Sequence, residues 1–387
     1  MAQASRQTSI PSISPKLQDV LEQIANDVVN HMGCVGAMVA TLEQGLALVV
    51  RAYANATDGM QIEKALTLRE LGKLGPGAVL PLQDPSFADN LAVRAVFGEN
   101  GRTAPYLIAD DLAELFSPLI SRTDAQQLQQ RSDIHQAVVL PFLLNGEVVG
   151  SLVAAVSQPL TDRQLNILSA FGRQAAVAIQ NQRRLEAMQA LEHIVLRLQA
   201  RMTDEEATLQ TIVEGVVHGL GYAGAMVATL ENGRALPVRA YAVDVAPETI
   251  TAVEEAVGIR LLSEQAVVYL DDPQYQNNLS VRAVAGLNGP PEKYLVSAPL
   301  CDLFYPLVSL DLADQAQQLL GIKQVIAVPF FQADEIVGNL FVTSRKALFS
   351  DWDISLLTAL GKHAAAGQKN ARLYREMSEQ RRIAQTF

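Results

Sequence analysis

The sequence predicts an α+β protein that contains two tandem copies of one domain, each with a mainly antiparallel sheet. Three observations lead to this fold class. The run from Gly36 to Ala54 returns at Gly224 to Ala242, which is 188 residues later (224 minus 36). Some segments have helical apolar spacing and others are short strand-like runs, and glycine-containing turns join neighbouring runs into hairpins. The chain of 387 residues, 49% hydrophobic and 18% charged, is long enough for two packed cores.

The repeat extends over a whole domain and sets the domain boundaries. The pairs that keep the offset are spread along the copy: Asp84-Pro85 with Asp272-Pro273, Pro141-Phe142 with Pro329-Phe330, and Gly150 with Gly338. The expected organisation is a flexible tail at 1–15, a first domain at 16–185, a connecting helix at 186–202, a second domain at 203–374 and a C-terminal signalling helix at 375–387. This is duplication of a domain and not a short solenoid repeat.

The first expected elements of the copy are a helix and a hairpin. Apolar residues recur every three or four positions in Lys16–Met32, which predicts an amphipathic helix with one face toward a core. Two runs rich in Val and Leu follow, Ala37–Leu42 and Leu46–Ala54. They are joined by Glu43-Gln44-Gly45, a turn in which glycine accepts positive φ easily. These runs predict a β-hairpin.

The middle of the copy carries helical patterns and leads to a second hairpin. A short strand is expected at Tyr106–Ala109 and a helix around Asp124–Gln130. Strands at Ala137–Leu143 and Glu147–Val156 are joined by Leu144-Asn145-Gly146, and Asn-Gly is the strongest short hairpin signal. Two hairpins in each copy make the sheet mainly antiparallel.

A long helix is expected to close each copy. Thr161 is a good N-cap, and helical spacing continues from there to Arg201, so one helix joins the two domains. One stripe of this helix has the three-and-four spacing of a short coiled coil, and the same stripe would also suit packing on its own domain. The residues of the stripe are Met188, Leu191, Val195, Leu198 and Met202. A similar helix runs from Asp351 to beyond Arg382.

Composition and charge exclude several classes of protein. A formal net charge of −11 argues against nucleic acid as a partner, because phosphate contacts require clustered Lys and Arg. No run approaches the roughly 20 apolar residues that cross a bilayer, and the segment 1–15 lacks the features of a signal peptide. Two cysteines, Cys34 and Cys301, provide neither a disulfide framework nor a thiolate zinc site. We therefore expect a cytoplasmic protein with no membrane partner.

The order of elements and the motifs within them resemble GAF domains. The most specific stretch is Val138–Leu185, with its counterpart Ile326–Tyr374. Each contains a strand with the pattern VxxPF, a turn, a strand with a glycine, a Thr or Ser N-cap, and a helix ending in QNQRRL or KNARLY. The resemblance implies that each domain has a six-stranded sheet with helices on both faces. It also implies a small-ligand site under the helices and loops in the middle of the domain.

The resemblance leaves the ligand open. Bilin-binding relatives attach their chromophore through a cysteine, but Cys34 and Cys301 lie at unmatched positions, opposite Tyr222 and Ala113, so no covalent bilin is expected. Unmatched cysteines also argue against the thiol chemistry of the free methionine sulfoxide reductase branch. The five histidines show no metal-ligand spacing. We expect neither catalytic residues nor a metal site.

Cyclic-nucleotide GAF domains carry Asn-Lys, later a Phe, and three residues further Asp-Glu. The second copy offers Lys346, Phe349 and Asp353, but Arg345 stands in place of the Asn and Ile354 in place of the Glu. The match does not support cyclic-nucleotide binding, and the same residues suit the start of a helix.

The candidate ligand-binding residues come from the middle segments of both copies. They are Arg94, Tyr106, Asp110, Phe116 and His135 in the first copy and Arg282, Tyr294, Asp302 and Phe304 in the second. Each arginine belongs to a repeated NLxVRAV segment, where it could bind an anionic ligand or form a structural ion pair with Asp84 or Asp272. His135 is the histidine to test for contact with haem or another ligand.

Together these features predict a non-catalytic sensory module that binds a small ligand, dimerises, or does both, and relays a signal through coiled-coil helices. We expect homodimer contacts in the helices 185–202 and 356–377. The terminal run RRIAQT resembles the linker into SpoIIE-like serine phosphatases, so an output phosphatase or kinase is an expected partner. The alternatives are a ligand-free dimerisation scaffold with a filled interior and, last, a GAF-fold enzyme. The copies differ at candidate site positions, and we expect at most one copy to bind a ligand.

Overall fold

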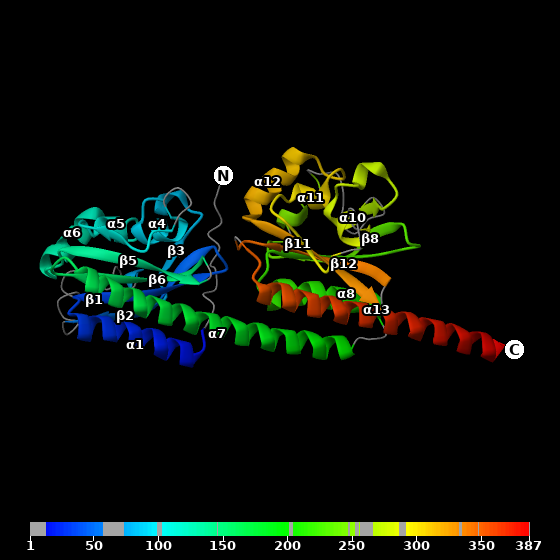
Figure 1. The fold of residues 1–387 in the computed structure, drawn as a ribbon, viewed down its shortest axis with the longest axis horizontal. Coiled ribbons are helices and arrows are strands. Elements are labelled where there is room, and N and C mark those ends of the chain that lie inside the picture. Colours follow the sequence, from blue (N-terminus) through cyan, green and yellow to red (C-terminus); the bar gives the residue numbers. More distant parts are fainter. Residues whose placement is uncertain are drawn as a thin grey trace. The chain divides into compact units, whose positions relative to one another are not determined.

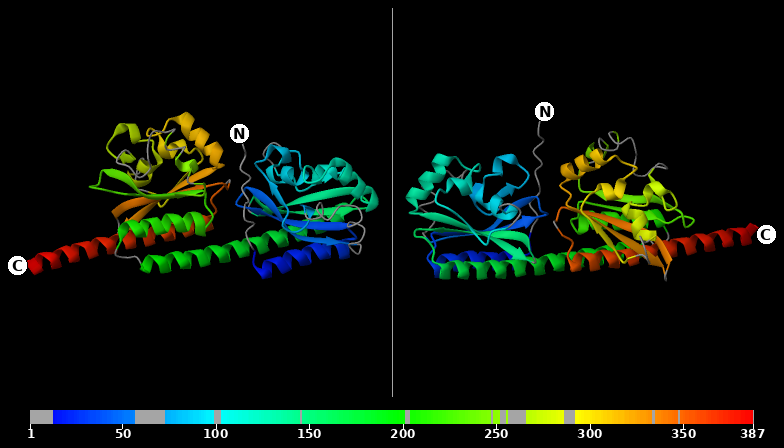
Figure 2. Two further views of the ribbon diagram at one scale, coloured as in Figure 1. Left: turned by 180° about the vertical axis from the view of Figure 1, so that it is seen from behind. Right: turned by 45° about the horizontal axis from the view of Figure 1, so that its top comes forward.

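A computed structural model of the chain contains two compact units, Met1–Arg184 and Leu185–Phe387 (Figures 1 and 2). The structure describes residues 13–56, 73–98, 103–144, 146–200, 204–246, 248–251, 255, 266–285, 292–332, 335–346 and 348–386. Most of the predicted tail at 1–15 lies outside these residues, and Pro15 already begins the first helix. Within the described parts, no helix is long and apolar enough to cross a membrane.

Six strands form one antiparallel sheet in the first unit, which confirms the predicted fold class. The strands are β1 (Gly36–Glu43), β2 (Ala47–Asn55), β3 (Val79–Pro81), β4 (Leu107–Ala109), β5 (Gln136–Leu144) and β6 (Glu147–Val156). Their order is β3-β2-β1-β6-β5-β4. The two predicted hairpins therefore lie side by side, because β1 of the first pairs with β6 of the second in the centre of the sheet.

Helices cover both faces of this sheet (Figure 1). One face carries α1 (Pro15–Met32) and the first part of α7 (Asp162–Ala200), and the other carries η1 (Pro85–Phe87), α4 (Leu91–Phe97), α5 (Ala113–Phe116) and α6 (Arg122–Arg131). Side chains on a strand point alternately to the two faces. In β6, Leu152 and Ala154 accordingly belong to the core under α1 and α7, whereas Val153 belongs to the core under α4, α5 and α6.

The second unit repeats the same architecture. Its elements are α8 (Glu205–Glu214), η2 (Gly215–Gly219), β7 (Gly224–Thr229), β8 (Ala235–Val243), β9 (Val267–Tyr269), η3 (Pro273–Tyr275), α10 (Leu279–Ala285), β10 (Leu295–Ser297), α11 (Cys301–Phe304), α12 (Leu310–Leu320), β11 (Gln324–Gln332), β12 (Glu335–Ser344) and α13 (Asp351–Thr386). The strand order β10-β11-β12-β7-β8-β9 is the order of the first unit read from the other edge. Here α8 and α13 lie under the sheet, and α10, α11 and α12 lie over it (Figure 1).

Both copies contain glycine at two kinds of position that disfavour a larger residue, a hairpin turn and a close contact between strands. The first hairpin turns at Gln44 and Gly45, both with positive φ (50° and 70°), a geometry that matches strand twist and favours glycine. In the second hairpin, a Cβ at Gly150 would collide with the carbonyl oxygen of Ala40 on the adjacent strand. Gly338 stands in the same relation to the second sheet, so a side chain at either position would separate the central strands.

The long helix α7 is continuous, as predicted, but its predicted coiled-coil stripe is divided between two environments. Leu198 is buried in the core of the second unit and Leu191 packs against that core. Met188 remains 57% exposed, and Met202 lies outside the described residues. Leu191 and Leu198, which the spacing alone assigned to contact with a partner helix, are therefore used for packing within the second unit. The close approach of Gly215 to Ile194 explains this, since a Cβ at Gly215 would collide with that side chain.

Candidate functional site

A cavity of about 100 Å³ lies in the first unit between the sheet and the helices α5 and α6. Strands β1, β2 and β6 form its floor, with Met38 and Val153 at the centre. Leu112 and the α5 residues Leu115 and Phe116 form much of its roof. The only polar side chains among the described lining residues are Tyr53 and Asn55. The cavity is thus a largely apolar space over the middle of the sheet, where ligand sites are commonly found.

A smaller space of about 30 Å³ continues from this cavity. Both spaces are lined by Met38, Leu115, Phe116 and Val153, so they adjoin. The smaller one also reaches Ser151 of β6, whose side chain is 1% exposed. Its hydroxyl has no hydrogen-bond partner among the residues that the structure describes. Buried polar groups in folded proteins are nearly always hydrogen-bonded, so this hydroxyl is an exception that calls for an explanation.

The edge of the cavity at β2 carries its other polar groups. The Asn55 amide donates a hydrogen bond to the Tyr53 hydroxyl. The Asn55 Oδ1 atom is buried and has no hydrogen-bond partner within the described parts of the chain. It lies 3.3 Å from the point that a Cβ on Gly36 would occupy. Partial burial raises the pKa of Tyr53, with the Asn55 bond acting in the opposite sense, so the Tyr53 hydroxyl is neutral and can also donate.

At two positions of the sheet the second unit carries larger side chains, although Ala316 stands where Leu128 lines the cavity of the first. Phe341 of β12 stands where the first copy has Val153, is 1% exposed, and belongs to the core under α10, α11 and α12. Asn339 replaces Ser151, and its amide donates a hydrogen bond of 3.4 Å to the carbonyl oxygen of Ser280. An aromatic ring fills far more space than an isopropyl group, so Phe341 occupies the place of the cavity floor in the second copy.

The structure places only Phe116, of the five candidates in the first copy, in the wall of the cavity. Arg94 lies 3.6 Å from Glu114, so the carboxylate in range is Glu114 and not the expected Asp84, which caps η1. Tyr106 packs against the core on the opposite face, under α1 and α7.

Two further candidates of the first copy lie near the surface. Asp110 is exposed, and its carbonyl oxygen accepts a hydrogen bond of 2.6 Å from the Gln129 amide. His135 is exposed immediately before β5, where its backbone N–H donates to the Val156 carbonyl oxygen at 2.7 Å. The cavity wall is instead reached by the preceding residue, Ile134.

The candidates of the second copy have different surroundings. Phe304 packs against the core under α10, α11 and α12, whereas Tyr294 is 37% exposed just before β10. Asp302 accepts a hydrogen bond from the Ser297 hydroxyl. The Nε atom of Arg282 is buried and finds no hydrogen-bond partner in the described ranges, and its expected partner Asp272 caps η3.

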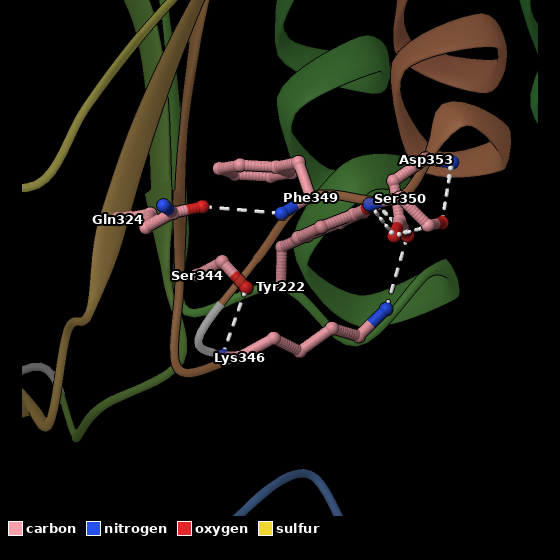
Figure 3. A network of polar contacts seen from close by, with 7 residues as sticks. All are labelled: Tyr222, Gln324, Ser344, Lys346, Phe349, Ser350 and Asp353. Carbon is pink, nitrogen blue, oxygen red and sulfur yellow. Dashed lines mark hydrogen bonds and ion pairs between the residues drawn. The ribbon is translucent and has the colours of Figure 1, made fainter. Parts of the chain in front are cut away.

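Lys346, Phe349 and Asp353 form a polar network at the start of α13 (Figure 3). Asp353 accepts hydrogen bonds from the Tyr222 hydroxyl (2.7 Å) and from Lys346 Nζ (3.0 Å), both through Oδ1. Its Oδ2 accepts from the backbone N–H (2.9 Å) and hydroxyl (2.6 Å) of Ser350. The Tyr222 ring stacks on Phe349 with centroids 6.0 Å apart. These residues tie α13 to the loop before it, which favours the helix-start interpretation of the motif.

The network shifts the titration of its members. Burial alone would raise the pKa of Asp353, but the charge of Lys346 and the hydrogen bonds from Ser350, Tyr222 and Lys346 lower it below its usual value. The pKa of Tyr222 is raised by burial and by the adjacent carboxylate. At neutral pH Asp353 is therefore a carboxylate and Tyr222 a neutral phenol.

The two cysteines lack the environment of reactive thiols. Cys34 is buried, and burial raises the pKa of its thiol to about 11. Cys301 is half-buried, and its pKa is raised first by burial and then by the neighbouring Asp302 and Asp314. A thiol is nucleophilic as its thiolate, which both surroundings disfavour.

Sequence reasoning missed Ser151, Val153 and Asn55, which floor and edge the cavity. The signal was present in the repeat, because the offset that aligns the copies pairs Val153 with Phe341 and Ser151 with Asn339. Comparison of the strand residues facing the middle helices would have shown that β6 carries smaller side chains than β12 at these two positions.

Comparison with known proteins gives one family for both copies. A model of the GAF domain matches residues 16–179 and again residues 204–367. The second GAF domain of DevS from Mycobacterium smegmatis is 24% identical, with 44% of this chain and 99% of that chain covered and a TM-score of 0.29. The blue-light absorbing form of the PixJ GAF-domain from Thermosynechococcus elongatus is 14% identical (46% and 93% covered, TM-score 0.31). Free methionine-R-sulfoxide reductase from Neisseria meningitidis is 15% identical (50% and 92% covered, TM-score 0.32). No curated protein matches the chain.

Proposed function

Because the chain belongs to the GAF domain family in two copies, we propose that it is a sensory module whose first copy binds a small molecule in the cavity beneath α5 and α6. GAF domains are typically regulatory modules for small ligands. In this proposal the second copy has a filled core and carries the signal into α13. The module is non-catalytic, and the high thiol pKa values of Cys34 and Cys301 support this part of the proposal.

The observation that carries the proposal is the exchange of Val153 in the first copy for Phe341 in the second. Both residues face the middle helices from the same place in the sheet, paired with Val139 and Ala327 respectively. Interiors are normally packed to the density of organic crystals. A cavity with an unpaired hydroxyl in one copy, at the place where an aromatic ring lies in the other, is better explained by a ligand than by loose packing.

The scaffold alternative requires a filled interior in both copies. The cavity of about 100 Å³ in the first copy argues against it. A scaffold has no use for that space, and empty apolar space lowers stability in proportion to its volume.

The test is a thermal-shift screen of the intact chain against small metabolites, including nucleotides and haem, on wild type and on Val153→Phe. A ligand present at 100 times its Kd stabilises the native state by about 2.7 kcal/mol. The shift of any hit in Tm should vanish in Val153→Phe and persist in the matched variant Phe341→Val. A hit that shifts Val153→Phe as much as wild type would show that the ligand binds elsewhere.

For signal relay we propose a homodimer formed through the helices 185–202 and 356–377, with an output phosphatase or kinase as the downstream partner. On α7, Leu185 and Met188 are 51% and 57% exposed, three residues apart. On α13, Leu373 and Met377 are 46% and 56% exposed, four residues apart. This spacing suits a seam that packs against the same seam of a second copy in a parallel pair.

Light scattering at micromolar concentration tests the dimer. We expect twice the monomer mass for wild type and for the control Gln189→Glu, which alters an exposed neighbour of the seam. Met188→Glu places a charge in the seam and should shift the mass toward the monomer. A monomeric wild-type chain, or a dimer unaffected by Met188→Glu, contradicts the proposed interface.

A further inference from the structure

We infer that the ligand of the first copy is a neutral, mainly apolar molecule about the size of one aromatic ring, held by a hydrogen bond to the Ser151 hydroxyl. This inference rests on the proposed function and specifies the chemistry of its ligand. It follows from the cavity wall, the two unpartnered polar atoms that reach it, and the contrast with the second copy.

The chemistry of the wall sets the charge of the ligand. None of the described residues that line either space has an ionisable side chain other than Tyr53. Moving a carboxylate, phosphate or ammonium group out of water without a counter-charge is very costly. A neutral ligand does not carry that cost, and the apolar wall favours one that buries carbon.

The size of the space sets the size of the ligand. The cavity and its continuation measure about 100 Å³ and about 30 Å³. Engineered apolar cavities of about 150 Å³ take benzene. The two spaces together are close to that size, so a single ring is about the largest group that fits, whereas a nucleotide does not fit within this space.

Ser151 supplies the inner polar contact. Strand alternation directs its side chain to the same face as Val153, and it borders the smaller space. The hydroxyl is 1% exposed and unpaired, so it keeps both a donor and two acceptor sites for a guest. A ligand hydroxyl or N–H at this depth would form a hydrogen bond with the Ser151 hydroxyl. That bond would compensate for the hydrogen bonds to water that the hydroxyl loses on burial.

Asn55 supplies the outer polar contact. Its buried Oδ1 atom has no partner, and it lies next to Gly36 at the cavity edge. A second hydrogen-bond donor on the ligand would meet this oxygen. The ligand is therefore expected to be polar at its two ends and apolar between them.

The second copy shows how the same place looks when it is closed. Asn339, at the position of Ser151, bonds to Ser280, at the position of Ala92. Phe341, at the position of Val153, fills the adjoining volume. The larger side chains leave less room, and the Asn339 N–H is bonded within the protein, although the Asn339 Oδ1 atom, like the Ser151 hydroxyl, has no hydrogen-bond partner among the described residues. The contrast between the copies therefore rests on the space, which Phe341 fills and Val153 leaves open.

Three probes of similar shape test this chemistry on the intact chain: phenol, toluene and benzoate. Ligand-observed NMR titration gives the Kd of each. We expect phenol to bind about 3- to 10-fold more tightly than toluene, which corresponds to one net hydrogen bond, and benzoate to bind weakest. Ser151→Ala should abolish the advantage of phenol and leave toluene unchanged. The matched control is Asn339→Ala in the second copy, which should leave all three affinities at their wild-type values.

The outcomes separate this inference from the proposed function. If all probes bind to Val153→Phe as they bind to wild type, the cavity is not the ligand site and both ideas fail. If none binds wild type, the present inference fails, and the thermal-shift screen decides the proposed function. If binding is lost in Val153→Phe but benzoate binds more tightly than phenol, the ligand is anionic and only the present inference fails. It also fails if Ser151→Ala leaves the ratio of phenol to toluene intact, since the hydroxyl then serves another role, such as holding a water molecule.

Discussion

Replacement of Tyr222 by Phe isolates one hydrogen bond of the network at the start of α13. The variant keeps the ring, and therefore the stack on Phe349, but removes the hydroxyl that donates to Asp353 at 2.7 Å. Both partners are almost fully buried, Tyr222 at 4% and Asp353 at 7% exposure. Water cannot easily replace the lost donor, so the second domain should lose stability.

The expected loss follows from the charge of the acceptor. A hydrogen bond to a charged group contributes about 1.5–3 kcal/mol, compared with about 1 kcal/mol for a neutral pair. Three other hydrogen bonds to Asp353 remain, from Lys346 and from the backbone and side chain of Ser350. We therefore expect a loss of about 2 kcal/mol at pH 7. With a urea m-value of about 2 kcal/mol/M, the unfolding midpoint falls by about 1 M.

The single tryptophan makes the assay specific to one domain. Trp352 lies beside Asp353 in α13, so its fluorescence during urea unfolding follows the second domain and not the first. The folded pKa of Asp353 is lowered from 3.8, and its stabilisation is therefore present above about pH 4 and lost as the pH falls through the folded pKa. The wild type should be destabilised by acid, and its advantage over Tyr222→Phe should shrink below about pH 4.

The control is Tyr294→Phe, at a tyrosine of the same domain that is 37% exposed, where a change within about 0.5 kcal/mol is expected. A Tyr222→Phe midpoint equal to that of the control at pH 7 would refute the reasoning. It would show that the desolvation of Asp353 cancels the gain from the bond. An unchanged difference between pH 7 and pH 3 would refute the linkage to the carboxylate.

Three further changes test the packing of the second domain, each by the fluorescence assay. Gly338→Ala should cost about 1–3 kcal/mol or more, because the new Cβ meets the carbonyl oxygen of Ala228; an unchanged midpoint would show that the strands can separate freely. Leu198→Ala should cost about 2–5 kcal/mol, whereas Met188→Ala, at an exposed position, should change stability by less than about 0.5 kcal/mol; equal effects would contradict the place of Leu198 in the second core. Phe341→Val should cost about 2–4 kcal/mol through the space it opens, and a neutral result would mean that the core collapses around it.

The fold could be predicted from local signals because those signals agree with tertiary packing. The turn at Gln44 and Gly45 and the N-caps before the long helices are determined by residues close together in sequence. The coiled-coil stripe was predicted less well, since spacing identifies an apolar face but not the surface that covers it. Leu198 is covered by the second core because Gly215 lets α7 approach η2 closely, and such a contact is not visible in the periodicity of α7.

The candidate site was predicted poorly for a physical reason. Tyr106, Asp110 and His135 are candidates because aromatic and charged side chains often contact ligands. A cavity, however, forms where the side chains that line it are small. Val153 and Ser151 are ordinary strand residues whose meaning appears only when a larger residue stands at the same position of another copy. Phe116 lies in the cavity wall because its helix α5 lies over the sheet, and its role as a ligand-binding residue stays a prediction.

The exchange of Val153 for Phe341 has a consequence for how such a chain can diverge. Within a single domain, enlarging a ligand cavity lowers the stability of the core, because each buried methylene that is removed reduces the free energy of unfolding. A duplicated domain removes that conflict, because substitutions that reshape the cavity of the first copy do not alter the core of the second copy. On the proposed function, substitutions along β6 can then change which ligand binds, while the residues of the second core stay the same. Variation among descendants of this chain should accordingly concentrate around the first sheet.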